Sequence, residues 1–210
     1  MRCFKICAAA VLLVCLTGPA FSAGDNDPDW PCVQRKIPAL SAGMMWAGPP
    51  IDEKAEKMWS ADSELAALVA RISARRTTLD EATEQIAAYA GKLEAQSKTE
   101  KLTALFAGVL STINSERTQI MKGITKFTRK QQELADTIRK TRQEFTKALK
   151  VKPKTDESRK AVRELEQKLS WQSRIHQDRE RSLQFVCESP VILEQRTFAL
   201  AREIANQLSD

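Results

Sequence analysis

A long stretch of the chain, from Ser97 to Lys152, contains no proline, and it can form one continuous helix. About 50 helical residues span roughly 75 Å, more than twice the width of a small globular domain. Five successive heptad positions in this stretch are apolar, which is typical of coiled-coil packing. These positions are Phe106, Ile113, Ile120, Phe127 and Leu134. The sequence therefore predicts an all-α, elongated protein.

Pro153 ends this helix, because the residue before a proline disfavours the helical conformation. Thr155 or Asp156 can cap a second long helix. A short connection makes two long helices antiparallel neighbours. We therefore predict a helical hairpin, a coiled coil over about residues 98–186, with its tip near residues 150–156.

Polar residues interrupt the inward rows of both helices near the middle of this hairpin. They are Arg117, Gln131, Gln172, His176 and Arg179. Counting outward from the tip places Phe127 opposite about His176, and Arg117 opposite roughly Cys187. Polar core positions commonly fix the register of a coiled coil at a cost in stability. A hinge in the hairpin is the alternative interpretation.

Start signals predict shorter helices around the hairpin. The first runs from Asp52 to about Arg75, and the second begins at the capping box Thr78–Glu81. Another capping box, Ser97–Glu100, opens the long helix. Ser189-Pro190 places a capping residue before a proline, which predicts the start of a fifth helix.

The first residues have the three parts of a secretory signal. Arg2 and Lys5 give a basic start, an apolar run too short to span a bilayer follows, and small residues end at Ser22. We therefore predict a signal peptide over residues 1–22 and a periplasmic location, with secretion as the runner-up. An uncleaved anchor and a lipoprotein acylated at Cys15 are the alternatives.

Cleavage would leave two cysteines in the mature chain, Cys32 and Cys187. An oxidising compartment permits disulfides, so the pair predicts one intramolecular bridge. Free buried thiols or an intermolecular bridge are the alternatives. Neither cysteine belongs to a CxxC motif, which argues against redox catalysis.

Residues 23–50 are expected to form an irregular strap over a helical domain of residues 51–210. Five of the eight prolines lie in this strap, which disfavours regular structure. Trp30 and the segment Met44–Trp46 are nevertheless too apolar for a free tail. A disordered leader is the alternative.

No constellation of catalytic or metal-binding residues is recognisable in the sequence. The chain has one histidine, His176, and no Glu-x-x-His motif. The segment Asp25–Asp29 resembles the start of a calcium loop, but Trp30 stands where that loop needs glycine and Lys36 where it needs glutamate. We interpret this segment as acidic and solvated. The sequence predicts no enzyme activity, no metal and no cofactor.

Basic residues are concentrated around the predicted tip. The formal net charge is +6, and it falls to +4 after cleavage because the signal carries two basic and no acidic residues. Residues 126–154 hold ten basic and three acidic residues, a net charge of +7, so the rest of the mature chain is mildly acidic. The residues predicted to bind a partner are Arg139, Lys140, Arg142, Lys147, Lys150, Lys152 and Lys154.

The predicted compartment narrows the choice of partner for this basic tip. Exported proteins rarely meet nucleic acid, and no aromatic platform interleaves the charges, so nucleic acid is not expected. An envelope protein or an anionic membrane surface is the expected partner, and a homo-oligomer is possible. A solvated face that keeps the arm soluble is the alternative. The first hypothesis is therefore a periplasmic coiled-coil scaffold that docks an envelope partner.

In export, basic character and a long helical hairpin, the chain resembles the Skp-type periplasmic chaperones. The resemblance implies a second hypothesis, a holdase whose arms hold unfolded envelope proteins. That family has a small β-sheet trimerisation body, and this sequence shows no matching strands. A third hypothesis, an enzyme or solute-binding protein, needs a concave polar pocket that such narrow helix patterns do not predict.

Overall fold

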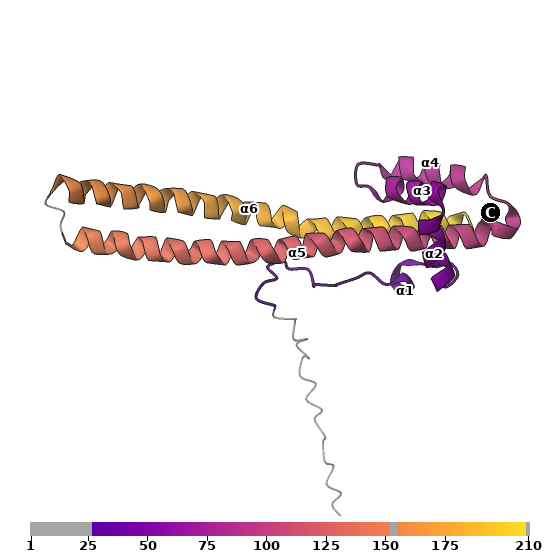
Figure 1. Ribbon diagram of the computed structural model, residues 1–210, viewed down its shortest axis with the longest axis horizontal. Coiled ribbons are helices and arrows are strands. Elements are labelled where there is room, and N and C mark those ends of the chain that lie inside the picture. Colours follow the sequence, from indigo (N-terminus) through magenta and orange to yellow (C-terminus); the bar gives the residue numbers. More distant parts are fainter. Residues whose placement is uncertain (1–26, 152–154, 209–210) are drawn as a thin grey trace, which may run out of the picture.

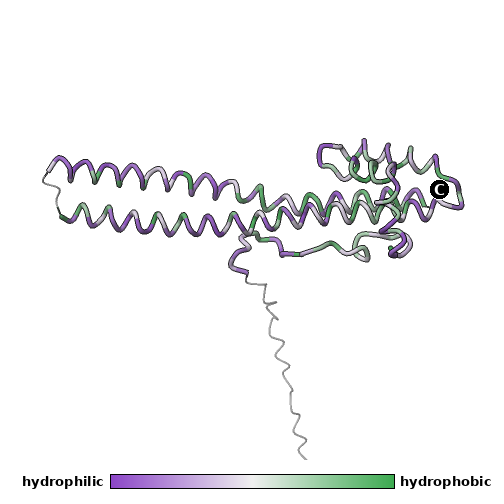
Figure 2. Tube along the Cα trace, viewed as in Figure 1, coloured by the Kyte–Doolittle hydropathy of each residue, from purple (hydrophilic) through white to green (hydrophobic). Residues whose placement is uncertain are grey.

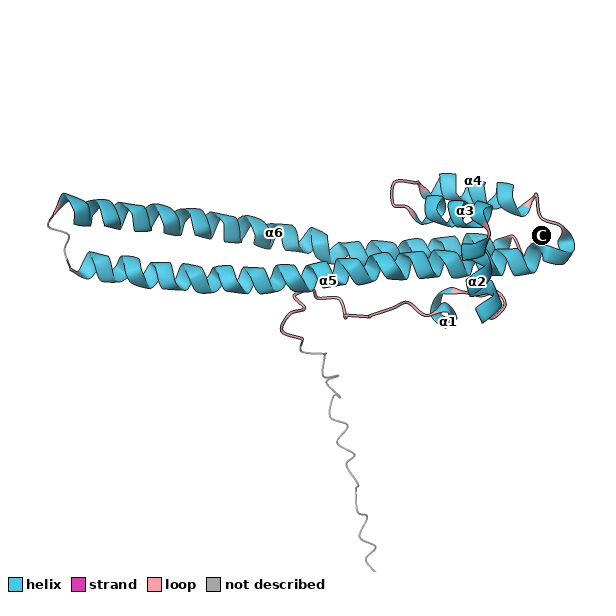
Figure 3. Ribbon diagram, in the orientation of Figure 1, coloured by secondary structure: helices cyan, strands magenta, loops and turns pink. Residues whose placement is uncertain are grey.

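The computed structural model describes residues 27–151 and 155–208, and within them every regular element is a helix (Figure 3). Two long helices, α5 (Ala95–Lys150) and α6 (Asp156–Asn206), pack as an antiparallel hairpin along the long axis of the molecule (Figure 1). The predicted all-α hairpin is thereby confirmed. The predicted signal peptide and the predicted binding residues Lys152 and Lys154 lie outside the described residues.

Four short helices gather at the end of the hairpin away from the tip, which we call the base (Figure 1). They are α1 (Ala42–Met45), α2 (Glu53–Ala61), α3 (Ser63–Ser73) and α4 (Leu79–Ala90). α2 and α3 pack on α5, whereas α4 packs on α6. We call the hairpin beyond the strap, residues 133–150 and 156–182, the arm.

The apolar core lies in the base, and the arm is mostly hydrophilic along its length (Figure 2). Leu65, Phe106 and Ile204 are fully buried there, and each such side chain contributes about 1.5–3 kcal/mol relative to exposure. In the arm the inward residues Leu134 and Phe145 are only half-buried, because two helices alone leave the sides of their seam open. The base therefore supplies most of the hydrophobic stabilisation.

The predicted first helix is in fact two helices, α2 and α3, which meet at Asp62. The backbone of Asp62 is extended, with φ −87° and ψ 112°. Its carboxylate accepts hydrogen bonds from the backbone N–H groups of Glu64 and Leu65, at 3.0 and 3.1 Å. Because this side chain caps the start of α3, the chain turns there, and the prediction of one continuous helix to Arg75 was wrong.

Two other predicted starts are also wrong. α5 begins at Ala95 after Glu94, so the Ser97 capping box is not used as a start. Pro190 lies inside α6 instead of opening a fifth helix. An internal proline costs one backbone hydrogen bond, but the buried residues Leu193 and Leu200 hold the following turns against the base.

The remaining helix signals are confirmed. Thr78 and Glu81 exchange both hydrogen bonds of a capping box at the start of α4. Thr155 caps α6 in the same way with Ser158. α5 is continuous through Gly123, where a Cβ atom would meet nothing within 4 Å, so this glycine faces open solvent.

The strap runs along α5 and is fixed at several points. Cys32 and Cys187 form the predicted disulfide, with an S–S distance of 2.05 Å. The side chain of Asn114 bonds both backbone groups of Leu40, accepting from N–H at 2.8 Å and donating to C=O at 2.9 Å. Near the base, the ring of Trp46 stacks on that of Phe106 at 4.5 Å between centroids. Covalent, polar and aromatic contacts together hold the strap on the hairpin.

The polar residues between the long helices place the register about one helical turn away from the predicted one, with Gln131 instead of Phe127 at His176 and Arg117 at Pro190 instead of Cys187. Gln131 donates to the backbone carbonyl of His176 at 3.2 Å, and the guanidinium of Arg117 donates to the carbonyls of Pro190 and Ile37, both at 3.4 Å. Burial lowers the pKa of Arg117, and Glu194 opposes this effect. Arg179 is exposed, so its predicted inward position was wrong.

Candidate functional site

Cations of α5, joined by Lys36 of the strap, lie in two groups along the hairpin. Glu133 and Asp136 separate the groups, so each can be treated as a patch. The strap patch consists of Lys36, Lys122, Lys126, Arg129 and Lys130. The tip patch consists of Arg139, Lys140, Arg142, Lys147 and Lys150, all of them exposed.

The tip patch contains five of the seven residues predicted to bind a partner. Four of them line one shallow hollow of about 430 Å³ together with Gln143 and Thr146: Arg139, Arg142, Lys147 and Lys150. Lys140 is exposed on the same helix but does not line this hollow. The structure therefore brings most of the described candidates onto one continuous strip of α5.

Near the tip, the net positive charge of the described residues lies on α5. Between residues 139 and 150, α5 carries five basic residues and one acidic residue, Glu144, a net charge of +4. On α6, residues 156–170 carry four basic and four acidic residues, which cancel. Near its tip the arm therefore has a cationic face on α5 and a balanced face on α6.

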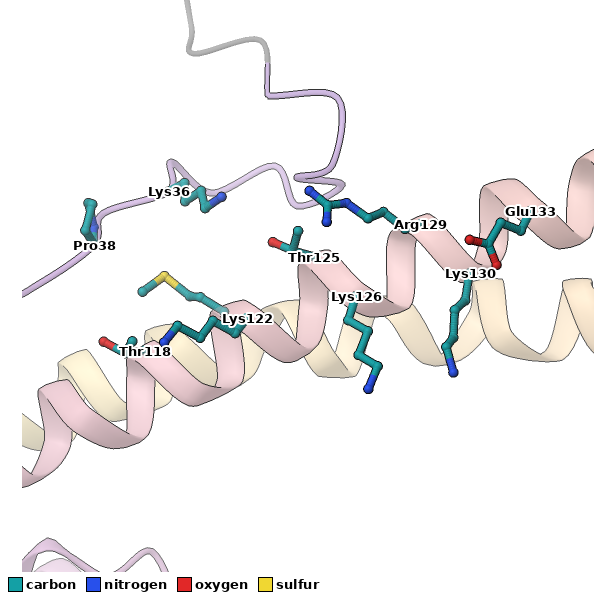
Figure 4. A pocket seen from close by; sticks show the side chains of 10 residues that line it. Lys36, Pro38, Thr118, Lys122, Thr125, Lys126, Arg129, Lys130 and Glu133 are labelled. Carbon is teal, nitrogen blue, oxygen red and sulfur yellow. The ribbon is translucent and has the colours of Figure 1, made fainter.

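The strap patch surrounds a larger hollow, of about 670 Å³, between the strap and α5 (Figure 4). Lys36 and Pro38 contribute to it from the strap, and the other lining residues come from α5. The sequence did not indicate this patch as a site because Lys36 is far from α5 in sequence. The spacing of Lys122, Lys126 and Arg129 on the face opposite the apolar rows is the signal that could have indicated it.

Acidic residues of the strap neutralise part of the strap patch. Arg129 forms a two-nitrogen contact with one carboxylate oxygen of Asp29, at 2.6 and 2.7 Å. Lys36 pairs with Asp27 at 2.6 Å, and this hydrogen bond, helped by the backbone N–H of Asp29, lowers the pKa of Asp27. The interpretation of this acidic segment as simply solvated was therefore wrong for Asp27 and Asp29.

The cations of the strap patch do not converge on one point. Arg129 reaches toward the strap, whereas Lys126 and Lys130 extend on the other side of the helix (Figure 4). A single small anion needs several donors aimed at one place. Cations that point in different directions instead suit an extended anionic surface.

In the tip patch, fewer of the charges are satisfied within the chain. Arg139 pairs with Asp136 one turn earlier on α5. For Lys147 and Lys150, no ion pair is found among the described residues. Both lie in the last turn of α5, where the helix dipole favours cations. Their charges therefore stabilise the helix end and remain available to an anionic partner.

The described residues offer no metal centre and no membrane span. They include no group of three or more His, Cys, Asp or Glu residues placed to hold a metal ion. His176 is half-buried, with Nδ1 3.8 Å from a carboxylate oxygen of Glu180. In the same part of the chain, no helix combines the length and apolar character needed to cross a membrane.

Fold and surface together define an all-α hairpin protein with a braced base and an arm that is cationic along α5. Comparison with protein-family models, with curated proteins and with solved structures finds no match to this chain.

Proposed function

We propose that this chain is an exported coiled-coil interaction protein that docks an anionic envelope partner through the tip patch. The observation that carries the proposal is the placement of the charge. A net +4 lies on one strip of α5, at the end of an arm that projects from the base, while the opposite helix is balanced. A face used only for solubility needs no such one-sided arrangement.

The physics of exposed charges sets the expected strength of such docking. Each exposed ion pair contributes only about 0–1 kcal/mol, so several lysines and arginines must act together. Their summed field extends about 8 Å at physiological ionic strength and raises the rate of encounter with an anionic surface. Binding through the tip patch should therefore be fast and sensitive to salt.

In-cell photocrosslinking identifies the partner. A photoreactive residue at Gln143 lies within the tip hollow and leaves all of its charges intact. We expect one discrete protein adduct in the cell envelope, read by gel and mass spectrometry. A smear of many outer-membrane proteins would instead favour the holdase hypothesis. If no protein adduct forms and vesicles containing phosphatidylglycerol do not bind either, the proposal is wrong.

Charge removal tests whether the tip patch causes the binding. We expect Lys147→Gln with Lys150→Gln to weaken adduct formation and to reduce its dependence on salt, because both lysines are exposed and neither has an ion pair within the part of the chain that the structure describes. Arg163→Gln with Lys168→Gln is the matched control, since it removes two exposed cations from the balanced face of α6. Equal effects of the two double variants would show that net charge, and not the tip patch, governs binding.

A further inference from the structure

The described part of the strap begins with two aspartates that lie on the strap patch. We call residues 27–29 the acidic segment. Asp27 pairs with Lys36 at 2.6 Å, and Asp29 pairs with Arg129 at 2.6 Å. Carboxylates of the same chain therefore already occupy two of the five cations of the strap patch.

The contacts of the acidic segment are weak enough to exchange with an outside ligand. The side chain of Arg129 is 63% exposed and that of Asp29 is 22% exposed, and an exposed ion pair contributes only about 0–1 kcal/mol. The side-chain amide of Gln132 adds an exposed hydrogen bond to the carbonyl of Pro28 at 3.2 Å. The disulfide at Cys32 keeps the segment close to α5, so these weak contacts form at a high local concentration. A ligand of the same chemistry can displace the segment while the rest of the strap stays in place.

The other three cations of the strap patch have no such carboxylate. Lys122, Lys126 and Lys130 are exposed, and no ion pair is found for them among the described residues (Figure 4). Successive members are four residues apart, so they follow one side of α5 at intervals of about 6 Å. Of the described residues that line the hollow, Glu133 alone is acidic. This row of lysines therefore keeps a net positive charge.

We propose that the strap patch binds an acidic peptide segment of another protein, and that the acidic segment of the strap is its internal competitor. The structure shows the kind of ligand that fits, because the present occupant is a peptide with carboxylates two residues apart. In an extended peptide, alternate side chains point the same way at intervals of about 6.6 Å. This spacing is close to the interval between the lysines of the row. The inference does not rest on the function proposed for the tip patch.

The competitor predicts the sign of a mutational effect. If the acidic segment competes with the ligand, removal of its carboxylates raises the affinity, although it adds no contact to the ligand. If the segment served only to anchor the strap, its removal would leave the affinity unchanged or lower it. A gain of affinity therefore distinguishes the two roles.

Fluorescence anisotropy tests the proposal on the purified protein with its disulfide intact. The probe is a fluorescein-labelled peptide of alternating aspartate and glycine, and the same peptide with asparagine in place of aspartate is the control ligand. We expect Asp27→Asn with Asp29→Asn to bind the acidic probe about three- to tenfold more tightly than the wild type. Lys122→Gln with Lys126→Gln should bind it several-fold more weakly and with less dependence on salt. The asparagine peptide should bind none of these proteins.

A second double variant controls for net charge. Glu164 pairs with Lys160 at 3.9 Å and Asp178 with Arg181 at 3.4 Å, all on α6. Glu164→Gln with Asp178→Asn therefore also removes two carboxylates and releases two cations, but away from the strap patch. The affinity for the acidic probe should rise much less than in Asp27→Asn with Asp29→Asn.

A pair of backgrounds locates the competition. Asp29→Asn alone should raise the affinity, but it should change nothing in an Arg129→Gln background, because Asp29 acts through Arg129. The gain should persist in a protein that carries Lys147→Gln and Lys150→Gln, since those residues belong to the tip patch. Failure of the tip patch to bind a partner would therefore leave this result unaffected.

Four outcomes overturn the proposal. One is no binding of the acidic probe by any variant at low salt. A second is an equal gain in Asp27→Asn with Asp29→Asn and in the charge control on α6. A third is a gain from Asp29→Asn that persists without Arg129. The fourth is binding of phosphatidylglycerol vesicles with the expected order of variants while the peptide does not bind, which would assign the strap patch to a lipid surface.

Discussion

At the scale of single residues, Tyr89 shows how burial changes the chemistry of one side chain. Its ring is buried in the base, and its hydroxyl group has no hydrogen-bond partner among the described residues. Burial is the main cause that raises the pKa of this hydroxyl to about 12, and the nearby carboxylates of Asp62 and Glu64 add to it. The folded protein therefore strongly favours the neutral phenol.

Tyr89→Phe should increase the free energy of unfolding by about 1 kcal/mol, because it removes an unsatisfied buried hydroxyl group. It should also change the pH dependence. The unfolded chain releases this proton near pH 10 and the folded chain near 12, so wild-type stability falls as pH rises across that interval. The variant should lose that part of the decline, as measured by urea unfolding at pH 8 and 11.

A direct titration supplies the control. The sequence contains one tyrosine, so the absorbance of tyrosinate reports Tyr89 alone. A midpoint near 10 in the folded protein would contradict the buried, unpaired environment of this hydroxyl.

At the scale of elements, two glycines in α5 occupy opposite environments on one helix. Gly108 lies in the base, where a Cβ atom would meet Val69 Cγ2 at 2.6 Å and Trp59 Cδ2 at 2.9 Å. Gly123 faces open solvent, with nothing within 4 Å of a Cβ atom. Gly108 therefore permits close packing of α2 and α3 on α5, whereas Gly123 serves no contact of that kind.

Gly123→Ala should stabilise the protein by about 0.5–1 kcal/mol, because alanine loses less backbone entropy in a helix. Gly108→Ala should destabilise it by about 1–3 kcal/mol, since the added methyl group overpacks the base. Thermal unfolding followed by circular dichroism measures both. Stabilisation by both variants would show that the base tolerates more volume than its packing indicates.

The sequence predicted the elements whose signals are local, and it missed those that depend on contacts distant in sequence. Thr78 and Thr155 were identified as caps because a capping box needs only four neighbouring residues. Pro190 was misread because the packing that carries α6 past it comes from the base. The strap patch was missed for a similar reason. Lys36 and Lys122 line the same hollow only because the disulfide and Asn114 hold the strap on the hairpin.

At the scale of the whole molecule, the disulfide links two residues that lie far apart in the sequence. Cys32 and Cys187 are separated by 155 residues, and their bridge fixes the strap to α6 near the boundary between base and arm. Leu40 of the strap belongs to the hydrophobic core, but the other buried core residues lie in helices, so most of the core does not depend on this bridge. The bridge mainly restricts the unfolded chain and the strap.

Replacement of Cys32 and Cys187 together by serine should lower the free energy of unfolding by about 5 kcal/mol in the chain-entropy view. Helicity measured by circular dichroism should persist at low denaturant, while hydrogen exchange at the amide of Leu40 should accelerate as the strap loosens. The wild-type protein treated with a reductant is the control. Loss of helicity in native buffer would show that the bridge is needed to form the hairpin itself.

The bracing of the base by the strap and disulfide has a mechanical consequence. The hairpin behaves as a beam clamped at one end, and its free length from Cys187 to the tip is about 50 Å. The deflection of a clamped beam is greatest at its free end and rises steeply with free length. Thermal bending therefore lets the cationic tip sweep a volume around a fixed base. Deleting one heptad from each long helix would shorten the free length of the arm. The tip would then sweep a smaller volume, while every charge of the base would stay in place.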